Sequence, residues 1–304
     1  MSKPRYSART LPQVIADAAA TYGERVAITD GAVQLTYAEL DTARIQSARA
    51  FLAAGLEKGE RIAIWAPNIY QWIIAAIGAQ SIGGVLVPLN TRYKGSEAAY
   101  ILRASGARML FTVDEFLGAR YPDMLADQSV PALQCTVTLC GAAVNCQTWE
   151  SFLASGEAIP ADEVARRAEA LTPDDTLDIL FTSGTTGNPK GVVTCHGQNI
   201  RAFDEWSRCV DLQADDRYLI INPFFHSFGY KAGWLAALVR GCTIYPLAGF
   251  DTDSVLTLIG RARISFLPGS PTLFLSFLAH PRLKEFDLSS LRVAVTGAAA
   301  IAPS

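Results

Sequence analysis

A segment rich in glycines and hydroxyls interrupts an apolar run in the middle of the chain. The sequence LDILFTSGTTGNPKGVVTCHG covers residues 177–197. Its polar part consists of Thr182, Ser183, Gly184, Thr185, Thr186, Gly187 and Lys190. Glycines let the backbone approach a ligand with its N–H groups outward, hydroxyls add donors, and the lysine adds a positive charge. This combination predicts a loop that holds a polyphosphate.

The spacing distinguishes this loop from two better-known phosphate-binding motifs. A Walker A loop that began at Gly184 would need Gly and Lys five and six residues later, but Pro189 and Lys190 stand there. The chain also contains no G-x-G-x-x-G, so a dinucleotide-binding fingerprint is not supported. A flexible surface linker is the alternative, but linkers do not normally follow an apolar strand directly.

A second group of residues surrounds His226. The segment NPFFHSFGY, residues 222–230, places this histidine among Phe224, Phe225, Phe228 and Tyr230. Judged by residue types alone, a histidine in an aromatic run serves packing more often than catalysis. Both interpretations stay open at this point.

The unusual segments of the second half each follow a predicted buried strand. TSGTTGNPK follows LDILF, NPFFHSFGY follows RYLII, PGSP follows ISFL, and TGAAAIAPS follows LRVAV. Ligands of open α/β sheets bind beyond the carboxyl ends of the strands. The four segments therefore predict one common site.

The elements that must position this site alternate between strands and helices, which predicts an α/β fold with largely parallel sheets covered on both faces. Thr36 and Glu39 have capping-box spacing, and the helix they open is expected to stop at Gly55. Ser96 is a candidate cap for the helix EAAYILRASG. Further helices are expected near 198–212, 229–240, 252–263 and 271–279, whereas residues 114–170 give a weaker pattern.

Composition narrows the functional classes. The chain has 304 residues, 50% of them hydrophobic, and a formal charge of −3, so it lacks the basic surplus of a nucleic-acid-binding protein. Six cysteines without a C-x-x-C pair and three histidines predict neither a metal site nor disulfides, which favours a cytoplasmic location. Residues 62–91 carry no charge, but Pro67-Asn68 and Gly83-Gly84 divide them into pieces too short to span a membrane.

The motifs resemble those of the adenylate-forming superfamily, which contains acyl-CoA synthetases, peptide-synthetase adenylation domains and luciferases. FTSGTTGNPKGVV is similar to its phosphate loop, HGQNI to the helix start that follows, NPFFHSFGY to its aromatic-histidine motif and TGAAAIAPS to its adenine-facing strand end. LTYAELD and residues 59–90 match its N-terminal region. The resemblance implies the large N-terminal domain of that fold, with two mostly parallel sheets in an αβαβα layering and without the small C-terminal domain. We expect a division into α/β subdomains at 1–170 and 171–304.

The resemblance also implies an activity and its residues. A carboxylic acid would attack the α-phosphorus of ATP, pyrophosphate would leave, and the acyl-adenylate would meet a thiol such as coenzyme A. The residues implied to be catalytic are Thr182, Lys190 and His226. The phosphate-loop residues named above would hold the β- and γ-phosphates, with Mg²⁺ on the same oxygens, and Gly297, Ala298 and Ala299 would line the adenine and acyl pocket. The expected substrate contacts are Phe225, His226, Phe228, Gly229, Tyr230, Lys231, Pro268 and Gly269.

Several alternatives stay open. DDRYLIINPFFHSFGYKAG and FDLSSLRVAVTGAA resemble actinobacterial ligases for polycyclic acids from steroid or terpenoid breakdown. The family continues beyond the segment matched here, so we expect a fragment that is a poor catalyst alone. A nucleotide- or adenylate-binding module without turnover, and a ligase that loads a carrier-protein thiol, are the other hypotheses. A homodimer is an open alternative for assembly.

Overall fold

The computed structural model describes residues 9–182 and 188–297. Its larger sheet has seven strands in the order β11-β10-β4-β3-β5-β8-β9. Their bounds are β3 Arg61–Trp65, β4 Val85–Pro88, β5 Met109–Val113, β8 Cys135–Cys140, β9 Gln147–Thr148, β10 Thr176–Thr182 and β11 Lys190–Cys195. Neighbouring strands are parallel except for the antiparallel pair of β10 and β11. The carboxyl ends of β4 and β10 therefore lie at the same edge.

The second sheet has six strands in the order β15-β14-β12-β13-β1-β2. Their bounds are β1 Val26–Asp30, β2 Val33–Thr36, β12 Arg217–Ile220, β13 Thr243–Pro246, β14 Phe266–Gly269 and β15 Val293–Thr296. Only β1 and β2 pair antiparallel in this sheet. A small hairpin, β6 Glu115–Phe116 with β7 Ala119–Arg120, lies apart from both sheets.

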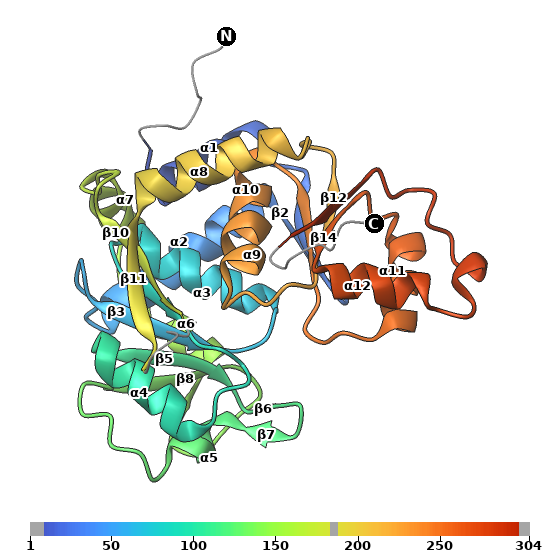
Figure 1. Ribbon diagram of the computed structural model, residues 1–304. Coiled ribbons are helices and arrows are strands. Elements are labelled where there is room, and N and C mark those ends of the chain that lie inside the picture. The colour runs from blue at the N-terminus through green and yellow to red at the C-terminus, as the bar shows by residue number, and fades with distance from the viewer. Residues whose placement is uncertain (1–8, 183–187, 298–304) are drawn as a thin grey trace.

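Helices cover both sheets and fill the space between them. Their bounds are α1 Leu11–Tyr22, α2 Tyr37–Ala53, α3 Tyr70–Ser81, α4 Gly95–Ser105, α5 Tyr121–Leu125, α6 Trp149–Ser155, α7 Ala161–Glu169, α8 His196–Cys209, α9 Ser227–Gly229, α10 Ala236–Arg240, α11 Thr252–Ala262 and α12 Pro271–Leu278. A π-helix, Tyr230–Leu235, joins α9 to α10, and a 3₁₀ turn covers Leu283–Glu285. Figure 1 shows α3, α9 and α10 between the sheets, α4 and α5 beyond the seven-stranded sheet, and α11 and α12 beyond β12 and β14. The predicted αβαβα layering is confirmed.

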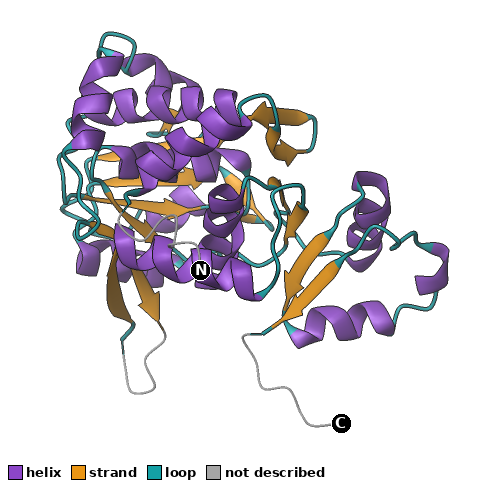
Figure 2. Cartoon of the chain, turned by 90° about the horizontal axis from the view of Figure 1, so that it is seen from above, coloured by secondary structure: helices purple, strands orange, loops and turns teal. Residues whose placement is uncertain are grey.

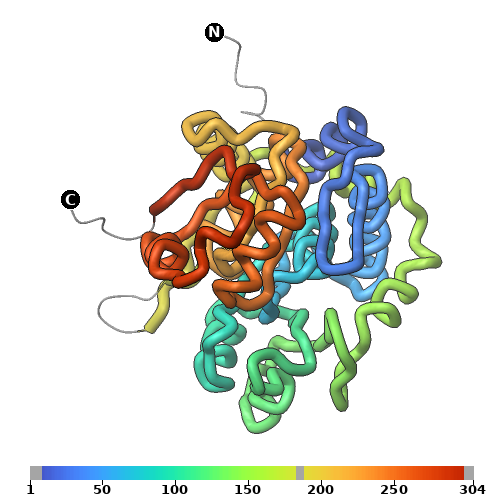
Figure 3. Tube along the Cα trace, turned by 90° about the vertical axis from the view of Figure 1, so that its right-hand side faces the viewer, coloured from blue at the N-terminus to red at the C-terminus, as the bar shows by residue number. Residues whose placement is uncertain are grey.

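Side-chain alternation along β12 shows how the six-stranded sheet separates two cores. Tyr218 and Ile220 point into the large core, whereas Leu219 points into a smaller core under α11 and α12. Residues of a strand alternate between its two faces. A strand that is buried on both faces therefore needs apolar residues at successive positions, as at Tyr218, Leu219 and Ile220. Figure 3, seen from the side of α11 and α12, shows that segment in front of the strands.

The two sheets do not follow the expected division at residue 170. Asp178 of β10 pairs with Leu86 of β4, and Ile28 of β1 pairs with Ile244 of β13, so each sheet takes strands from both sides of that residue. Parallel pairing joins strands through long crossover connections, which makes sheet membership independent of order along the chain.

Local predictions were right at one helix start and wrong at another. Thr36 Oγ1 accepts the Glu39 N–H at 3.2 Å and Glu39 Oε2 accepts the Thr36 N–H at 2.8 Å, which confirms the capping box. The predicted cap at Ser96 is wrong, because α4 begins at Gly95 and Glu97 accepts the Lys94 N–H.

Residues 62–91 form β3, α3 and β4, and in the described part of the chain no helix is long and apolar enough to cross a bilayer.

Candidate functional site: a cavity at the carboxyl ends of the strands

A cavity of about 290 Å³ lies where the two sheets meet. It is bounded by the carboxyl ends of β4 and β10 and by the loop that follows β12. Its lining residues are Pro88, Asn90, Tyr93, Leu180, Phe181, Thr182, Phe225, His226 and Ser227. The structure thus brings Thr182, Phe225 and His226 together, although more than forty residues separate the two segments. This is the edge at which ligands bind in open α/β sheets.

The ends of the phosphate-loop segment are fixed by strand pairing. Thr182 ends β10, Lys190 begins β11, and the two residues are register partners in the antiparallel pair. Both are exposed, and Figure 2 shows their hairpin projecting from the body of the molecule. Ser183, Gly184, Thr185, Thr186 and Gly187 lie outside the described residues. The hairpin therefore brings a hydroxyl and a cation to the two sides of one loop.

His226 presents one face to the cavity and uses the other to begin a helix. Its Nδ1 accepts the Phe228 N–H at 3.4 Å at the N-terminus of the short α9. A neutral imidazole whose Nδ1 accepts a hydrogen bond carries its proton on Nε2. The side chain is exposed, so Nε2–H is available as a donor to a ligand.

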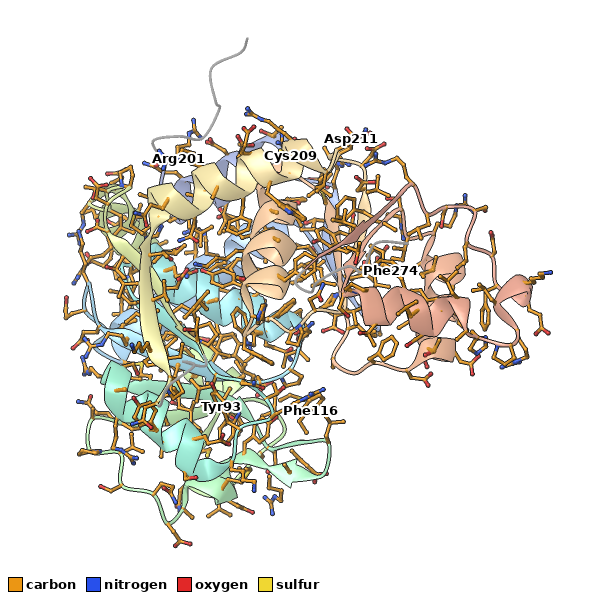
Figure 4. The ribbon with its side chains drawn as sticks, viewed as in Figure 1. Tyr93, Phe116, Arg201, Cys209, Asp211 and Phe274 are labelled. Carbon is orange, nitrogen blue, oxygen red and sulfur yellow. The ribbon has the colours of Figure 1, made fainter. Side chains whose placement is uncertain are left out.

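Sequence reasoning predicted only three of the nine lining residues, and Asn90 and Tyr93 are among those that it missed. They follow the carboxyl end of β4, so the strand-end rule applied to the second half of the chain would have found them in the first half. The Asn90 carbonyl accepts Trp65 Nε1–H at 2.9 Å, which fixes this connection to β3. Figure 4 shows Tyr93 near α4 and the lower end of β11. Burial, followed by the charge of Glu97, raises the pKa of Tyr93, so its phenol is neutral near neutral pH.

A second cavity of about 410 Å³ adjoins the first at Tyr93. Its other lining residues are Ser96, Glu97, Tyr100, Arg103, Asn188 and Pro189. The Tyr100 hydroxyl donates to the Pro189 carbonyl at 3.3 Å, which connects α4 to the end of the phosphate-loop segment. The two cavities therefore lie on either side of Tyr93, along the same hairpin.

Tyr230 and Lys231 do not line the cavity, and their role as substrate contacts stays a prediction. Tyr230 is fully buried, its hydroxyl accepts Gln80 Nε2–H at 2.9 Å, and its ring stacks on Trp234. Burial raises the pKa of Tyr230 well above its ordinary value, so the phenol stays neutral. Lys231 is 5% exposed, and its Nζ lies 3.0 Å from Asp178 Oδ1. Both side chains belong to the core behind the site.

The remaining predicted contacts lie around the cavity without lining it. Phe228 is half-buried and Gly229 is buried within the turn that carries His226. Pro268 and Gly269 end β14, and the Pro268 carbonyl accepts Asn222 Nδ2–H at 3.1 Å. Gly297 follows β15 at the same sheet edge, with open space around it, whereas Ala298 and Ala299 lie outside the described residues. Roles for these residues stay predictions.

Two further features bear on ligands. Among the described residues, no group of three or more His, Cys, Asp or Glu side chains could hold a metal ion. Asp178, which belongs to β10 of the phosphate-loop hairpin, is fully buried, and desolvation raises its pKa despite the opposing charge of Lys231. The polar groups of the described cavity are therefore mainly hydroxyl, amide and imidazole groups.

Curated relatives match the chain along almost its whole length. The protein named 3-[(3aS,4S,7aS)-7a-methyl-1,5-dioxo-octahydro-1H-inden-4-yl]propanoyl:CoA ligase is 41% identical over 298 residues in Rhodococcus jostii and 45% identical over 293 residues in Mycobacterium tuberculosis. These matches cover 96% of this chain but only 58% and 57% of those proteins. The chain thus spans less than two thirds of these relatives.

Solved structures match as well. The inhibitor-bound N-terminal domain of FACL13 from Mycobacterium tuberculosis has a TM-score of 0.83 and 27% identity, with 96% of this chain and 70% of that chain covered. An anthranilate CoA ligase, AuaEII, in complex with anthranoyl-AMP, has a TM-score of 0.85 at 22% identity, which supports the fold alone. The family described as AMP-binding enzyme matches residues 15–304. The chain therefore belongs to the AMP-binding enzyme family, and the resemblance inferred from its motifs is confirmed.

Proposed function

We propose that this chain provides the adenylation site of an acid–thiol ligase that activates a carboxylic acid with ATP and transfers the acyl group to coenzyme A. The observation that carries the proposal is the cavity that Thr182 and His226 share. It joins the end of a phosphate-binding segment to an imidazole donor, and these are the two kinds of group that adenylation needs.

The chemistry explains the demand for such groups. A carboxylate is a poor acyl donor, because oxide is a poor leaving group. Attack of the carboxylate oxygen on the α-phosphorus of ATP forms the acyl-phosphate bond and breaks the bond to pyrophosphate. A thiol then attacks the acyl carbon and releases AMP. Phosphoryl transfer of this kind depends on positioning and on stabilisation of charge more than on covalent help.

The described residues suit those tasks. The Thr182 hydroxyl and the Lys190 ammonium would hold the departing pyrophosphate, and His226 Nε2–H would donate to an oxygen near the acyl-phosphate bond. Mg²⁺ would neutralise charge on the phosphate oxygens, and because it keeps much of its coordination shell as water and substrate oxygen, it does not require a protein cage. The roles of Gly297, and of Ala298 and Ala299 outside the described residues, at the adenine are part of this proposal.

The proposed substrate is a bulky polycyclic acid of the steroid or terpenoid type. Both actinobacterial relatives carry the name of a ligase for a bicyclic propanoic acid, and their identities to this chain are 41% and 45%. All six cysteines are unpaired, which suits the reducing cytoplasm that we propose as the location. A homodimer stays a prediction.

The test combines binding with turnover. We expect the 304-residue chain to bind ATP and a sulfamoyl-adenosine mimic of the acyl-adenylate in isothermal titration calorimetry. Exchange of labelled pyrophosphate into ATP should depend on added bicyclic propanoic acid. Thioester analysis with coenzyme A or with a phosphopantetheinylated carrier protein then identifies the thiol. Absence of binding to both nucleotides would refute the proposal. Binding of both nucleotides without exchange of pyrophosphate would favour the binding module.

A further inference from the structure

Asn68 makes three hydrogen bonds to the segment that leads to His226. It lies between β3 and α3 and is 4% exposed. Its Nδ2 donates to the Ile220 carbonyl at 3.3 Å and to the Asn222 carbonyl at 2.9 Å. Its Oδ1 accepts the Phe224 N–H at 2.8 Å. One side chain from the connection between β3 and α3 thus binds the backbone at the end of β12 and in the loop that follows it.

The chemistry of this position requires an amide. An asparagine side chain supplies two N–H donors and a carbonyl acceptor, and here all of these functions are used. Aspartate would keep the acceptor but bring a negative charge against two carbonyl oxygens. Alanine would leave the Asn222 carbonyl and the Phe224 N–H without these partners, and each such group costs about 1–3 kcal/mol when it is buried. The Ile220 carbonyl would keep the hydrogen bond that it accepts from the Leu247 N–H.

Phe224 connects these bonds to the cavity. It is fully buried, and its ring packs edge-on against Trp72 of α3 with 5.4 Å between the ring centroids. The backbone and the ring of Phe224 are therefore both fixed to the β3–α3 connection. The next residues along the chain, Phe225 and His226, line the cavity.

We propose that Asn68 is a positioning residue that holds His226 at the cavity through the backbone of Phe224. The inference rests on the proposed function, in which His226 contacts the acyl-adenylate. Asn68 itself does not line the cavity. Its loss should therefore allow the segment 222–226 to move while the two sheets stay intact.

The experiment uses Asn68→Ala and Asn68→Asp, with Asp216→Asn as the matched control. Asp216 is 3% exposed and lies just before the opposite, amino-terminal end of β12. It accepts hydrogen bonds from the Gln213 N–H, from Ser265 Oγ and from Arg292, so its substitution also disturbs a buried polar junction of the same strand. The control therefore reports general destabilisation without a change beside His226.

Three readouts are measured on the 304-residue chain. Hydrogen exchange follows the Phe224 amide, imidazole NMR follows the three histidines, and calorimetry follows the sulfamoyl-adenosine mimic. In Asn68→Ala we expect at least tenfold faster exchange at Phe224, displaced His226 signals with unchanged His196 and His280 signals, and roughly tenfold weaker binding. Asn68→Asp keeps the acceptor and the volume, so it should fold and show the same binding loss. Asp216→Asn should leave the His226 signals and the affinity at the wild-type values.

Unchanged His226 signals and affinity in both Asn68 variants would overturn the positioning role while the proposed function stands. If the wild type fails to bind the mimic, the proposed function fails. The Phe224 and His226 readouts then still decide whether Asn68 orders this segment. An equal loss of affinity in Asp216→Asn would also overturn the inference, because it would show an effect of general stability.

Discussion

Lys231 Nζ lies 3.0 Å from Oδ1 of Asp178, and both side chains are buried. Asp178 belongs to β10, and Lys231 also donates to Thr194 Oγ1 of β11 at 2.9 Å. One lysine of the π-helix thus contacts both strands of the hairpin that ends in Thr182 and Lys190. The pair fixes the phosphate-loop hairpin against the segment that carries His226.

Removal of the lysine from this pair should destabilise the fold. Lys231→Met leaves Asp178 buried without its cation, and breaking a buried ion pair in this way costs about 3–5 kcal/mol. We expect urea unfolding to show a loss of this size. The double variant Asp178→Leu with Lys231→Met should regain much of it, because the unpaired buried carboxylate is then absent.

Arg282→Ala is the matched control for an ion pair in solvent. Arg282 Nη2 lies 3.0 Å from Asp253 Oδ1, and both side chains are more than half exposed. Exposed pairs contribute about 0–1 kcal/mol. A Lys231→Met loss no larger than that of Arg282→Ala would contradict the role of the buried pair.

Lys190→Ala tests the phosphate-binding segment. Lys190 is exposed at the start of β11, so its substitution should leave the unfolding free energy nearly unchanged. We expect roughly tenfold weaker binding of ATP, because a charge-assisted contact to the β- or γ-phosphate is lost, and little change for AMP. Calorimetry with both nucleotides measures this, with Lys284→Ala as an exposed-lysine control. Equal losses for ATP and AMP would refute the assignment.

The site could be predicted in part because its strongest signals are local. Unusual segments after the carboxyl ends of predicted strands mark a ligand site, and this rule located both Thr182 and His226. The places of Tyr230 and Lys231 could not be predicted, because they depend on tertiary partners. Lys231 contacts Asp178, 53 residues away, and a lysine inside an apolar stretch gives no local sign of such a partner. The division at residue 170 failed to match the sheets for the same reason, since β1 pairs with β13 across more than two hundred residues.

His196 should make stability depend on pH. It is fully buried at the start of α8, and its Nδ1 accepts the Leu11 N–H at 3.0 Å, which fixes α1. Burial lowers the pKa of His196 from 6.5 to about 4. Between these values the unfolded state binds more protons, so the contribution is complete above pH 6.5 and is lost as the pH falls toward 4. Its size is about 3 kcal/mol.

The variant His196→Asn isolates this contribution. Its side-chain oxygen lies where Nδ1 lies and accepts the same N–H, but it does not titrate. Urea unfolding at a series of pH values should therefore give a shallower pH dependence for the variant than for the wild type. Identical slopes would contradict the assignment to His196.

Gly229→Ala should deform the segment that carries His226. A Cβ at Gly229 would meet the backbone carbonyl oxygens of Asn222 and Pro223 in steric overlap. Neither carbonyl can yield easily, because the Asn222 carbonyl accepts Asn68 Nδ2–H and the Pro223 carbonyl accepts the His226 N–H. We expect a loss of about 2 kcal/mol in unfolding free energy and at least tenfold weaker binding of the adenylate mimic. Gly249→Ala is the matched control, because a Cβ there meets open space. Wild-type affinity in Gly229→Ala would show that the adenylate does not depend on the position of this segment.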